Sequence, residues 1–462
     1  MRSGQFYVAN ISTFPPRRCG VGSFAKDMIE SFLNDPRGRV GEWLTYPIVH
    51  EAGKTVYPAR YRMHIAQEIV QDNPSSYEDA ARSIVMLAKE LRSQGSDMGV
   101  FLNHEYGIFA EYHTQDNAVR LLEILKEGDV ASVIVGHTVL TNDSREDWEQ
   151  KRDVMVRMIQ NSDKFICITP SARKALMNPD LYFRVRGGVK EIIPRGKLID
   201  IAHGIPEVDF DKDRNELKRK YGFVKKDGTP RKLATSVGFL SPSKGIEYIL
   251  NGLSGVLKTR KDRDNILYLV AGATHEEILK QEGESYRESL IKLAKEKNIR
   301  GAVITRKKVA DRTVDEITDL YGNKLEDLTN VNLVFLNAHL DDRELLGIMK
   351  MSDYGVIGNL AEEQISSGPG TYWIGTGRIT IATESLFFKD MEDQGIGLLV
   401  PFKKGKAFYD RLNYVLDLSP KDREELEHIA SDFGSANTWN INGQKYLNVL
   451  NKIMIHKAGK RL

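Results

Sequence analysis

The stretch Glu362–Ser385, EEQISSGPGTYWIGTGRITIATES, places a glycine-rich turn, a short helical segment and a strand in immediate succession. Its paired serines are small residues that cap helices, and the proline after them is favoured in a first helical turn. We therefore expect a short helix over Thr371–Thr376 that ends at Gly377, followed by the apolar strand RITIATE. Glycines at this density allow a backbone to approach a ligand closely.

The same succession of strand, turn and helix recurs along the chain. Strands that alternate with helices form parallel sheets covered on both faces, so the pattern indicates an α/β fold. The charged, turn-rich segment 207–231 interrupts the alternation and indicates a domain boundary. We therefore expect two Rossmann-like doubly wound domains that face each other across a cleft. The strand candidates are FYVANIS, MGVFLNHE, SVIVGHT, KFICITP and KLIDIAHGIP before the boundary, and KLATSVGFL, NILYLVAGAT, NVNLVFLNAHL, DYGVIGNL, RITIATES and GIGLLVP after it.

Two further segments of the second half have a local interpretation. The polar segment 297–330 has an irregular pattern, and we expect it to decorate the second domain as an insertion. Asp341 and Asp342 precede a helical pattern, which favours a helix cap over a pair of metal-binding acids.

The composition of the 462 residues is ordinary for a globular protein, with 41% hydrophobic and 28% charged residues. A formal net charge of +2 gives no field that attracts nucleic acid. The two cysteines, Cys19 and Cys167, favour a reducing compartment, and a cytoplasmic location is expected. No apolar run approaches the roughly 20 residues of a membrane span. The basic tail KIMIHKAGKRL fits a solvated helix end better than peripheral contact with an anionic membrane.

The first glycine loop, RRCGVGS, follows the first strand and opens a helix. Main-chain N–H groups of Gly20, Val21 and Gly22 at a helix start would face an anion. Arg17 and Arg18 beside them favour an anionic or sugar ligand. A tight structural turn with solvated arginines fits the same residues equally well.

The second loop, GFLSPSKGIEYIL, places Lys244 at the first turn of a helix. The helix dipole already makes that end positive, so a lysine there favours phosphate binding. In the opening stretch, Ser366, Ser367, Gly368 and Pro369 form a second helix start whose positive end would serve the same anion. Because Pro369 has no N–H, the free donors would come from its neighbours, such as Gly370.

Three histidines follow strands: His104, His137 and His203. A single histidine in such a position is more often structural, whereas three on one rim indicate a polar pocket. Their spacing is not that of a zinc site, and we expect no metal.

Together these motifs resemble family 4 of the retaining glycosyltransferases, which have the two-domain GT-B fold. The resemblance is carried by FPPRRCGVGSF, VGHTVL, AHGIP, GFLSPSKGIEYIL, LVAGATH, LDDRELLGIMKMSDYGVIG and EQISSGPGTYWIGTGRITIATES, in the family's order over nearly the whole chain. The ending SANTWNINGQKYLNVLNKI resembles the family's last helix, which crosses back onto the first domain. By this resemblance, an acceptor-side domain spans 1–208 and is completed by 438–462, and a donor-binding domain spans 209–437.

The resemblance implies transfer of a sugar from a nucleotide-sugar donor, a UDP- or GDP-sugar, to a carbohydrate or small-molecule acceptor with retained anomeric configuration. It implies no cofactor, because lysine, arginine and helix N-termini balance the diphosphate in place of a metal. Lys244 matches the diphosphate-binding lysine, and His137 matches a histidine that contacts the donor sugar. Gly20 and Gly22 match the loop near the donor phosphates, and 366–370 match main-chain amides on the donor.

The same resemblance implies an acceptor pocket on the first domain near Arg17, Arg18, His104 and Glu105. Our hypothesis for the chemistry is a front-face displacement, in which an oxygen of the leaving phosphate accepts the proton of the acceptor hydroxyl. Such a reaction needs no covalent nucleophile; it needs preorganised groups that stabilise charge on the leaving group.

The chain also departs from the family pattern. Phe239 occupies the position of a usual arginine, and Gln364 and Tyr372 occupy the positions of two usual glutamates, although Glu362 and Glu363 lie just before them. Gln364 can still hydrogen-bond a sugar hydroxyl, whereas Tyr372 offers no charged acceptor for a ribose diol. Two alternatives therefore stay open: a glycoside phosphorylase or sugar-phosphate-dependent transferase on the same fold, and a non-catalytic sugar- or nucleotide-binding protein.

Overall fold

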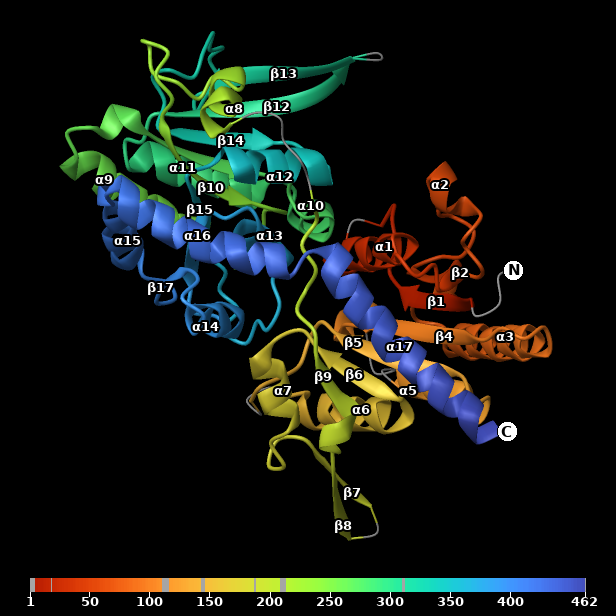
Figure 1. The fold of residues 1–462 in the computed structure, drawn as a ribbon. Helices are drawn as coiled ribbons and strands as arrows, with labels where there is room; N and C mark the ends of the chain where they lie inside the picture. Colours follow the sequence, from red (N-terminus) through yellow and green to blue (C-terminus); the bar gives the residue numbers. More distant parts are fainter. Residues whose placement is uncertain are drawn as a thin grey trace. The chain divides into compact units, whose positions relative to one another are not determined.

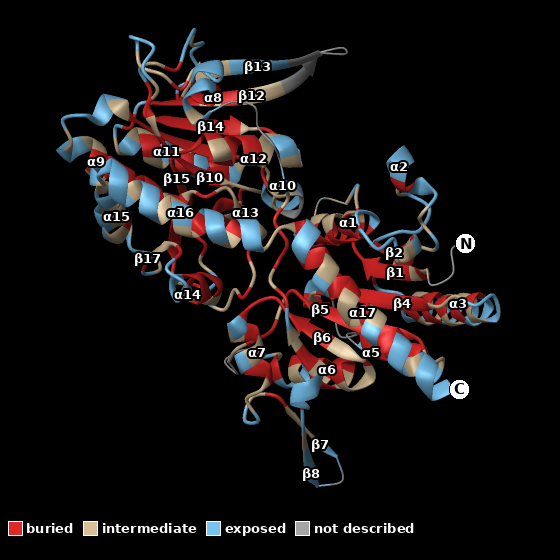
Figure 2. Cartoon of the chain, in the orientation of Figure 1, coloured by how far each residue is buried: buried red, intermediate tan, exposed pale blue. Residues whose placement is uncertain are grey.

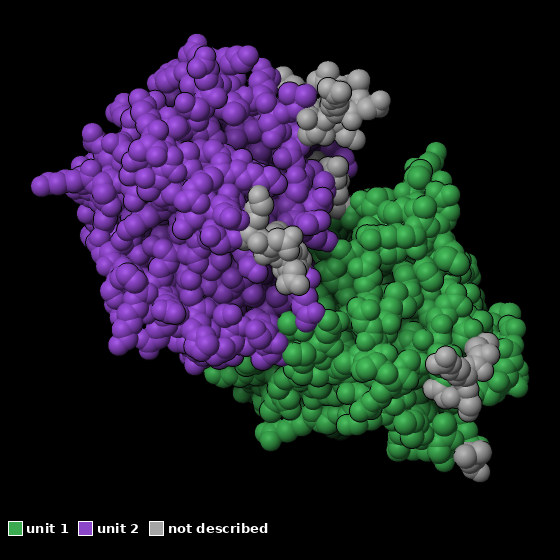
Figure 3. Space-filling model, turned by 45° about the horizontal axis from the view of Figure 1, so that its top comes forward, with its two compact units in different colours: residues 1–204, 437–462 green, residues 205–436 purple. Residues whose placement is uncertain are grey.

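The structure, a computed structural model, describes residues 5–17, 19–109, 116–142, 146–186, 188–207, 213–309 and 312–461. The chain divides into two compact units (Figure 3). Unit 1 comprises 1–204 and 437–462, and unit 2 comprises 205–436. Each unit contains a largely parallel sheet with helices on its faces (Figure 1), which confirms the expected α/β class with two Rossmann-like domains.

In unit 1 the described strands are ordered β3-β2-β1-β4-β5-β6-β9, and their pairings are parallel. The chain runs outward from β1 to β2 and β3, then returns to β4 and continues in the opposite direction. Ligands of such sheets bind beyond the carboxyl ends of the strands at this reversal, here β1 and β4. The elements of unit 1 are β1 (Phe6–Ser12), α1 (Gly20–Leu33), β2 (Val40–Val49), α2 (Ala59–Arg62), β3 (Ile69–Val70), α3 (Pro74–Ser93), β4 (Met98–His104), α4 (Tyr106–Phe109), α5 (Asp116–Glu127), β5 (Ala131–Gly136), α6 (Trp148–Asn161), β6 (Lys164–Cys167), α7 (Pro170–Leu176), β7 (Phe183–Arg186), β8 (Val189–Ile192), η1 (Arg195–Lys197), β9 (Leu198–Asp200) and α17 (Trp439–Arg461).

The helix α17 completes the core of unit 1 although it is the last element of the chain. Tyr446, Leu447 and Leu450 are buried on its inner face, which packs on β4 and β5. The close approach depends on Gly99 in β4, since a Cβ there would lie 2.6 Å from Leu450 Cδ1. The helix therefore covers apolar strands that would otherwise be exposed.

In unit 2 the described strands are ordered β13-β12-β14-β11-β10-β15-β16-β17, and their pairings are parallel except that of β12 with β13. Its elements are α8 (Arg214–Lys220), β10 (Lys232–Val237), η2 (Pro242–Lys244), α9 (Ile246–Thr259), η3 (Arg263–Asn265), β11 (Ile266–Ala271), α10 (Glu276–Glu282), α11 (Ser285–Glu296), β12 (Gly301–Val309), β13 (Arg312–Asp319), β14 (Leu333–Asn337), α12 (Asp342–Met351), β15 (Tyr354–Ile357), α13 (Gly368–Gly375), β16 (Ile379–Thr383), α14 (Leu386–Glu392), β17 (Leu398–Val400), α15 (Gly405–Asp417) and α16 (Pro420–Ala436).

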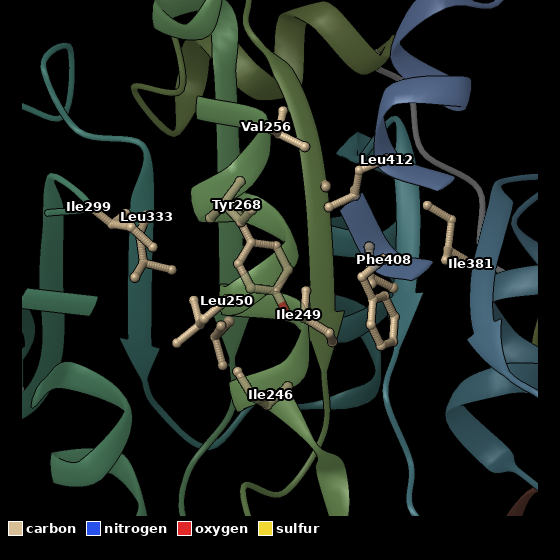
Figure 4. Packing of buried hydrophobic residues seen from close by; sticks show 14 of the residues in the cluster. Ile246, Ile249, Leu250, Val256, Tyr268, Ile299, Leu333, Ile381, Phe408 and Leu412 are labelled. Carbon is tan, nitrogen blue, oxygen red and sulfur yellow. The ribbon is translucent and has the colours of Figure 1, made fainter. Parts of the chain in front are cut away.

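The core of unit 2 lies between its sheet and the helices α9 and α15. Ile249 and Leu250 of α9 lie near Tyr268 of β11, and Phe408 comes from α15 (Figure 4). The two helices approach closely at Gly252, where a Cβ would lie 2.7 Å from Phe408 Cβ. The expected inward face of α9 is thereby confirmed.

A buried charged cluster holds the first and last helices of unit 2 against its sheet. Asp353 lies just before β15 and receives Lys218 of α8 at 2.5 Å, Arg214 at 3.2 Å and Arg423 of α16 at 2.8 Å. Arg214 and Arg423 also bind Glu427, both at 3.0 Å or less. Burial opposes ionisation of Asp353, but Lys218, Arg423 and the Leu233 N–H outweigh it and lower its pKa to about 2.

The expectation of an irregular insertion over 297–330 is wrong. The segment contains β12, which pairs in parallel with β14, and β13, which pairs antiparallel with β12. A charged residue such as Arg306 in β12 is tolerated because this hairpin forms the edge of the sheet, where the apolar pattern of a central strand is not required.

The predicted capping roles of the serine pair and of Asp341 are confirmed, although the bounds of the first helix differ. Ser367 is the N-cap of α13, which starts three residues earlier than expected and is followed by Gly377 at φ +68°. Asp341 caps α12 and forms a capping box with Glu344. None of the described helices is long and apolar enough to cross a membrane.

Candidate functional site

A small cavity of unit 2 opens at the carboxyl ends of β10, β11 and β15. Its apolar lining comes from the strands, and its polar side chains come from Ser236, Lys244, Asn359 and Ser367. The lining residues are Ser236, Val237, Gly238, Leu240, Lys244, Ile246, Val270, Ala271, Val356, Ile357, Gly358, Asn359, Ser367 and Pro369. The lysine loop and the serine-glycine turn, 116 residues and more apart in sequence, therefore meet at one cavity of this sheet edge.

Lys244 reaches the cavity from a 3-10 turn just before α9, rather than from within the first turn of that helix as expected. Gly245 follows it at φ +56° and packs on the Gly358 carbonyl oxygen, where a Cβ would clash. The Leu360 N–H donates to the Ser243 carbonyl at 2.9 Å, which joins the loop after β15 to the lysine turn. The backbone of both loops thus fixes where the lysine emerges.

The ammonium group of Lys244 is half-buried and lacks a counter-charge. No carboxylate lies within ion-pair distance of it in the described part of the chain, and burial alone lowers its pKa. A buried cation without a partner is costly, and an anionic ligand is the group that offsets this cost.

The start of α13 supplies the second feature of the cavity. Ser367 Oγ accepts from the Gly370 N–H at 3.0 Å, so this amide is already satisfied. Ser367 and Pro369 line the cavity, so the start of α13 and the positive end of its dipole lie at it. Pro369 has no N–H, and the Gly368 N–H makes no backbone hydrogen bond among the described residues. Ser366 is half-buried next to the cap.

Gln364 hydrogen-bonds a residue that lines this cavity, whereas Tyr372 is buried in an apolar cluster. Asn359, which lines the cavity, donates from Nδ2 to Gln364 Oε1 at 2.8 Å. Sequence reasoning missed Asn359, although it directly follows the apolar run of β15. Tyr372 is buried on α13 in an apolar cluster that includes Trp373 and Phe387.

In unit 1, the glycine loop and the strand-end histidines lie at the corresponding sheet edge. Gly20, Val21 and Gly22 form the first turn of α1, whose N-cap residue Cys19 makes no side-chain capping bond. The first amides of α1 are thus not satisfied by the side chain of its N-cap residue. Gly22 packs on Thr13, since a Cβ there would lie 3.4 Å from Thr13 Oγ1.

Arg17 has a structural partner, and Arg18 lies outside the described residues. The Arg17 guanidinium donates to Gln71 Oε1 at 3.1 Å and to the Ile48 carbonyl at 3.2 Å. This places it across the ends of β2 and β3 rather than free in solvent.

The three histidines are buried, and two of them contact Phe24 of α1. The centroid of the Phe24 ring lies 4.5 Å from that of His137 and 4.8 Å from that of His203. The main-chain N–H of His137 donates to the main-chain carbonyl of His104 at 2.9 Å. A polar chain supports His137: its Nε2 lies 3.1 Å from Asn103 Oδ1, while Asn103 Nδ2 donates to Asn10. Since the Asn103 amide nitrogen is used, His137 Nε2 carries the proton.

Burial keeps these histidines neutral. It lowers the pKa of His104 to about 3 and, together with the neighbouring His203 and His104, that of His137 to about 3. It also lowers the pKa of His203 to about 4, against the bond from Nδ1 to the Gly204 carbonyl at 2.6 Å. Burial raises the pKa of the neighbouring Glu105 carboxyl. The three imidazoles of this edge are therefore uncharged hydrogen-bonding groups at neutral pH, suited to hydroxyl ligands.

The described residues contain no cluster of three or more histidine, cysteine or acidic side chains arranged to hold a metal ion. What the sites offer is one cation and helix starts in unit 2, and neutral imidazoles with an open helix start in unit 1.

The fold and these strand-end sites define the chain as an α/β protein with the GT-B fold. No protein-family model matches the chain, and no curated protein matches it. Among solved structures, Anabaena HepE in complex with UDP matches with a TM-score of 0.63 at 11% identity, over 97% of this chain and 100% of that one. The E. coli trehalose-6-phosphate protein bound with UDP-2-fluoro glucose has a TM-score of 0.58 at 14% identity, over 96% and 99%. A Rickettsia africae glycosyltransferase has a TM-score of 0.62 at 12% identity, over 97% and 99%.

Proposed function

We propose that this chain is a retaining glycosyltransferase of the family-4 type. It would transfer a sugar from a nucleotide-sugar donor to a carbohydrate or small-molecule acceptor without a metal. The fold supports the class, and solved proteins of similar fold carry UDP or UDP-glucose. In this proposal unit 2 binds the donor and unit 1 binds the acceptor.

The observation that carries the proposal is the uncompensated lysine of the unit 2 cavity. Lys244, the α13 start and Asn359 converge there without a carboxylate in the lining. A phosphate would satisfy the ammonium group, the free amide and the helix dipole together. A sugar alone would leave the charge of Lys244 unbalanced.

The residues would act on the leaving group rather than on the sugar carbon. As the bond from the anomeric carbon to the phosphate oxygen lengthens, charge grows on that oxygen. Lys244 and the α13 start stabilise this charge from fixed positions. The leaving phosphate takes the proton of the acceptor hydroxyl, whose oxygen forms the new bond to the anomeric carbon on the same face. Gln364, held by Asn359, and His137, held by Asn103, orient hydroxyl groups.

A sugar-phosphate-dependent reaction is the second candidate, and one observation favours it. Tyr372, which the resemblance puts at the place of a ribose-binding acid, is packed in the apolar core. Unit 2 thus keeps a phosphate site but has no carboxylate at that position to hold a ribose diol.

The test is turnover of a donor panel by the wild type and two lysine variants. UDP-sugars, GDP-sugars and sugar 1-phosphates are supplied with glycan acceptors, and release of nucleoside diphosphate or phosphate is measured. Lys244→Ala should lower kcat/KM by roughly 10²-fold or more. Lys258→Ala, an exposed lysine of α9, is the matched control and should have no effect.

Each outcome decides between the candidates. Release of a nucleoside diphosphate that depends on Lys244 supports the transferase. Turnover of sugar 1-phosphates alone supports the second candidate. Binding without turnover, or a Lys244→Ala rate equal to wild type, overturns the proposed role of this lysine and the mechanism built on it.

A further inference from the structure

The hairpin β7–β8 of unit 1 exposes aliphatic side chains together with cations. The two strands pair only with each other, and the hairpin projects away from the rest of unit 1 (Figure 2). Val185 is 62% exposed, Val189 65% and Ile192 54%. Three large apolar side chains this exposed within eight residues form a patch that water does not favour.

The register of the hairpin alternates aliphatic and basic residues at its outer end. Val185 pairs with Lys190 and Arg186 pairs with Val189, in adjacent antiparallel positions. Paired residues share a face and adjacent pairs point to opposite faces, so each face carries one valine and one cation. The outer end is therefore apolar and basic all round, instead of having one flat apolar side.

Contacts at the base hold this hairpin in place. The Phe183 ring lies between the Arg152 guanidinium at 4.3 Å and the Lys190 ammonium at 4.5 Å. Arg184 binds Asp153 of α6 at 3.3 Å, and Glu191 accepts from Gln160 at 3.2 Å. An isolated two-stranded hairpin is only marginally stable. These contacts at the base therefore stabilise the hairpin and keep its three aliphatic side chains in solvent, where they add nothing to the core of unit 1.

The other basic segment, the end of α17, is already engaged within unit 1. Lys457 binds Asp129 and Asp163 at 3.3 Å, and Arg461 binds Asp97 at 2.9 Å and Asp129 at 2.5 Å. These carboxylates balance Lys457 and Arg461, two of the cations that the sequence offered for contact with a membrane.

We propose that the β7–β8 hairpin binds the surface of an anionic membrane. Val185, Val189 and Ile192 would enter the boundary of the acyl chains, and Arg186 would extend to the lipid phosphates. Lys190 would exchange its exposed ion pair with Asp180, at 3.4 Å, for a lipid phosphate. The outer end of the hairpin carries apolar and basic side chains on both faces. Lipids can surround both faces of an inserted hairpin, whereas a protein partner would cover only one face. The proposal is independent of the function proposed above.

The test is co-sedimentation of the full chain with vesicles. Vesicles of phosphatidylcholine with about one-third phosphatidylglycerol should bind the protein, and pure phosphatidylcholine vesicles should not. Arg186→Glu changes the charge by two and should lower the partition coefficient roughly 30-fold. Val185→Ser and Val189→Ser should each lower it roughly tenfold. The thermal melting curve of each variant should match that of the wild type, because these side chains are in solvent.

Two matched controls separate the hairpin from unspecific binding. Val56→Ser removes an aliphatic side chain that is 79% exposed elsewhere in unit 1, and Lys460→Glu reverses a charge in the basic tail. Neither should change vesicle binding. The proposal is overturned if anionic vesicles do not bind the chain, or if Lys460→Glu abolishes binding while the hairpin variants retain it. It is equally overturned if the hairpin variants dissociate a dimer and vesicle binding is absent.

Discussion

Acid should destabilise unit 1 through its three buried histidines. Burial lowers the pKa of His104 to about 3, of His137 to about 3 and of His203 to about 4, from the ordinary 6.5. Below pH 6.5 the unfolded chain binds protons that the folded unit does not bind. Stability is therefore complete above the unfolded pKa and is lost as the pH falls from 6.5 towards the folded values.

The size of the effect follows from these pKa values. At pH 5 the pH lies about 1.5 units below the pKa of a histidine in the unfolded chain. This difference corresponds to a loss of about 2 kcal/mol in the free energy of unfolding for each histidine. Three histidines together give about 6 kcal/mol if their effects add, a large part of the stability of a typical domain. Glu105 opposes the trend, because burial raises its pKa and favours protonation in the folded unit.

Hydrogen exchange measured by mass spectrometry can follow the two units in one sample. The opening free energy of amides in β4 and β5 should fall between pH 7 and 5, after correction for the intrinsic exchange rate. Amides of β10 and β11 in unit 2 are the internal reference. The slope of the opening free energy of unit 1 against pH should correspond to an uptake of nearly three histidine protons per unfolding event.

His104→Phe should remove one of these protons and leave unit 1 folded. His104 Nδ1 has no hydrogen-bond partner among the described residues, and the ring packs between Tyr106 and Phe109. The variant should therefore show a slope of two protons and a higher stability near pH 5. An uptake below one proton in the wild type, or an equal loss in unit 2, would refute the reasoning.

Three further changes test unit 2. Asp353→Asn leaves buried cations without their counter-charge and should lower the free energy of unfolding of unit 2 by about 3–5 kcal/mol, measured as the loss of amide protection in β10. Gly245→Ala forces a left-handed residue to carry a Cβ against the Gly358 carbonyl and should lower kcat/KM at least tenfold. Gly222→Ala, at φ +72° with open space around it, should leave kcat/KM unchanged. Ser367→Ala removes the cap of α13 and should cost about 1 kcal/mol of local stability, seen as faster exchange within that helix.

Local signals in the sequence were sufficient for much of the fold. Strands such as β5, buried on both faces, are apolar apart from one serine, and Ser367 and Asp341 are caps that act within one turn of their own helix. The two loops that meet at the unit 2 cavity were each identified from residues a few positions apart. Because such a pattern depends only on residues a few positions apart, it can be interpreted from the sequence without knowing the rest of the structure.

What was missed depends on distant neighbours. The polar strands β12 and β13 are stable because they lie at a sheet edge, which their own residues do not reveal. Tyr372 was placed by alignment to a motif, but the apolar packing around α13 puts it in the core. The support of His137 by Asn103 and Asn10 joins two strands more than 90 residues apart, and no spacing rule predicts such a chain.

The packing of α17 sets an order for biosynthesis. Residues 205–436 form a complete unit before residues 437–461 have been made, whereas the first 204 residues must wait for that helix to close their core. During translation, residues 1–204 therefore expose the apolar surface around Gly99 and Phe101, which α17 later covers, while residues 205–436 fold. A chain that stops just before Trp439 should consequently have a misfolded unit 1 and a folded unit 2. Chaperones should bind the amino-terminal segment of such a chain.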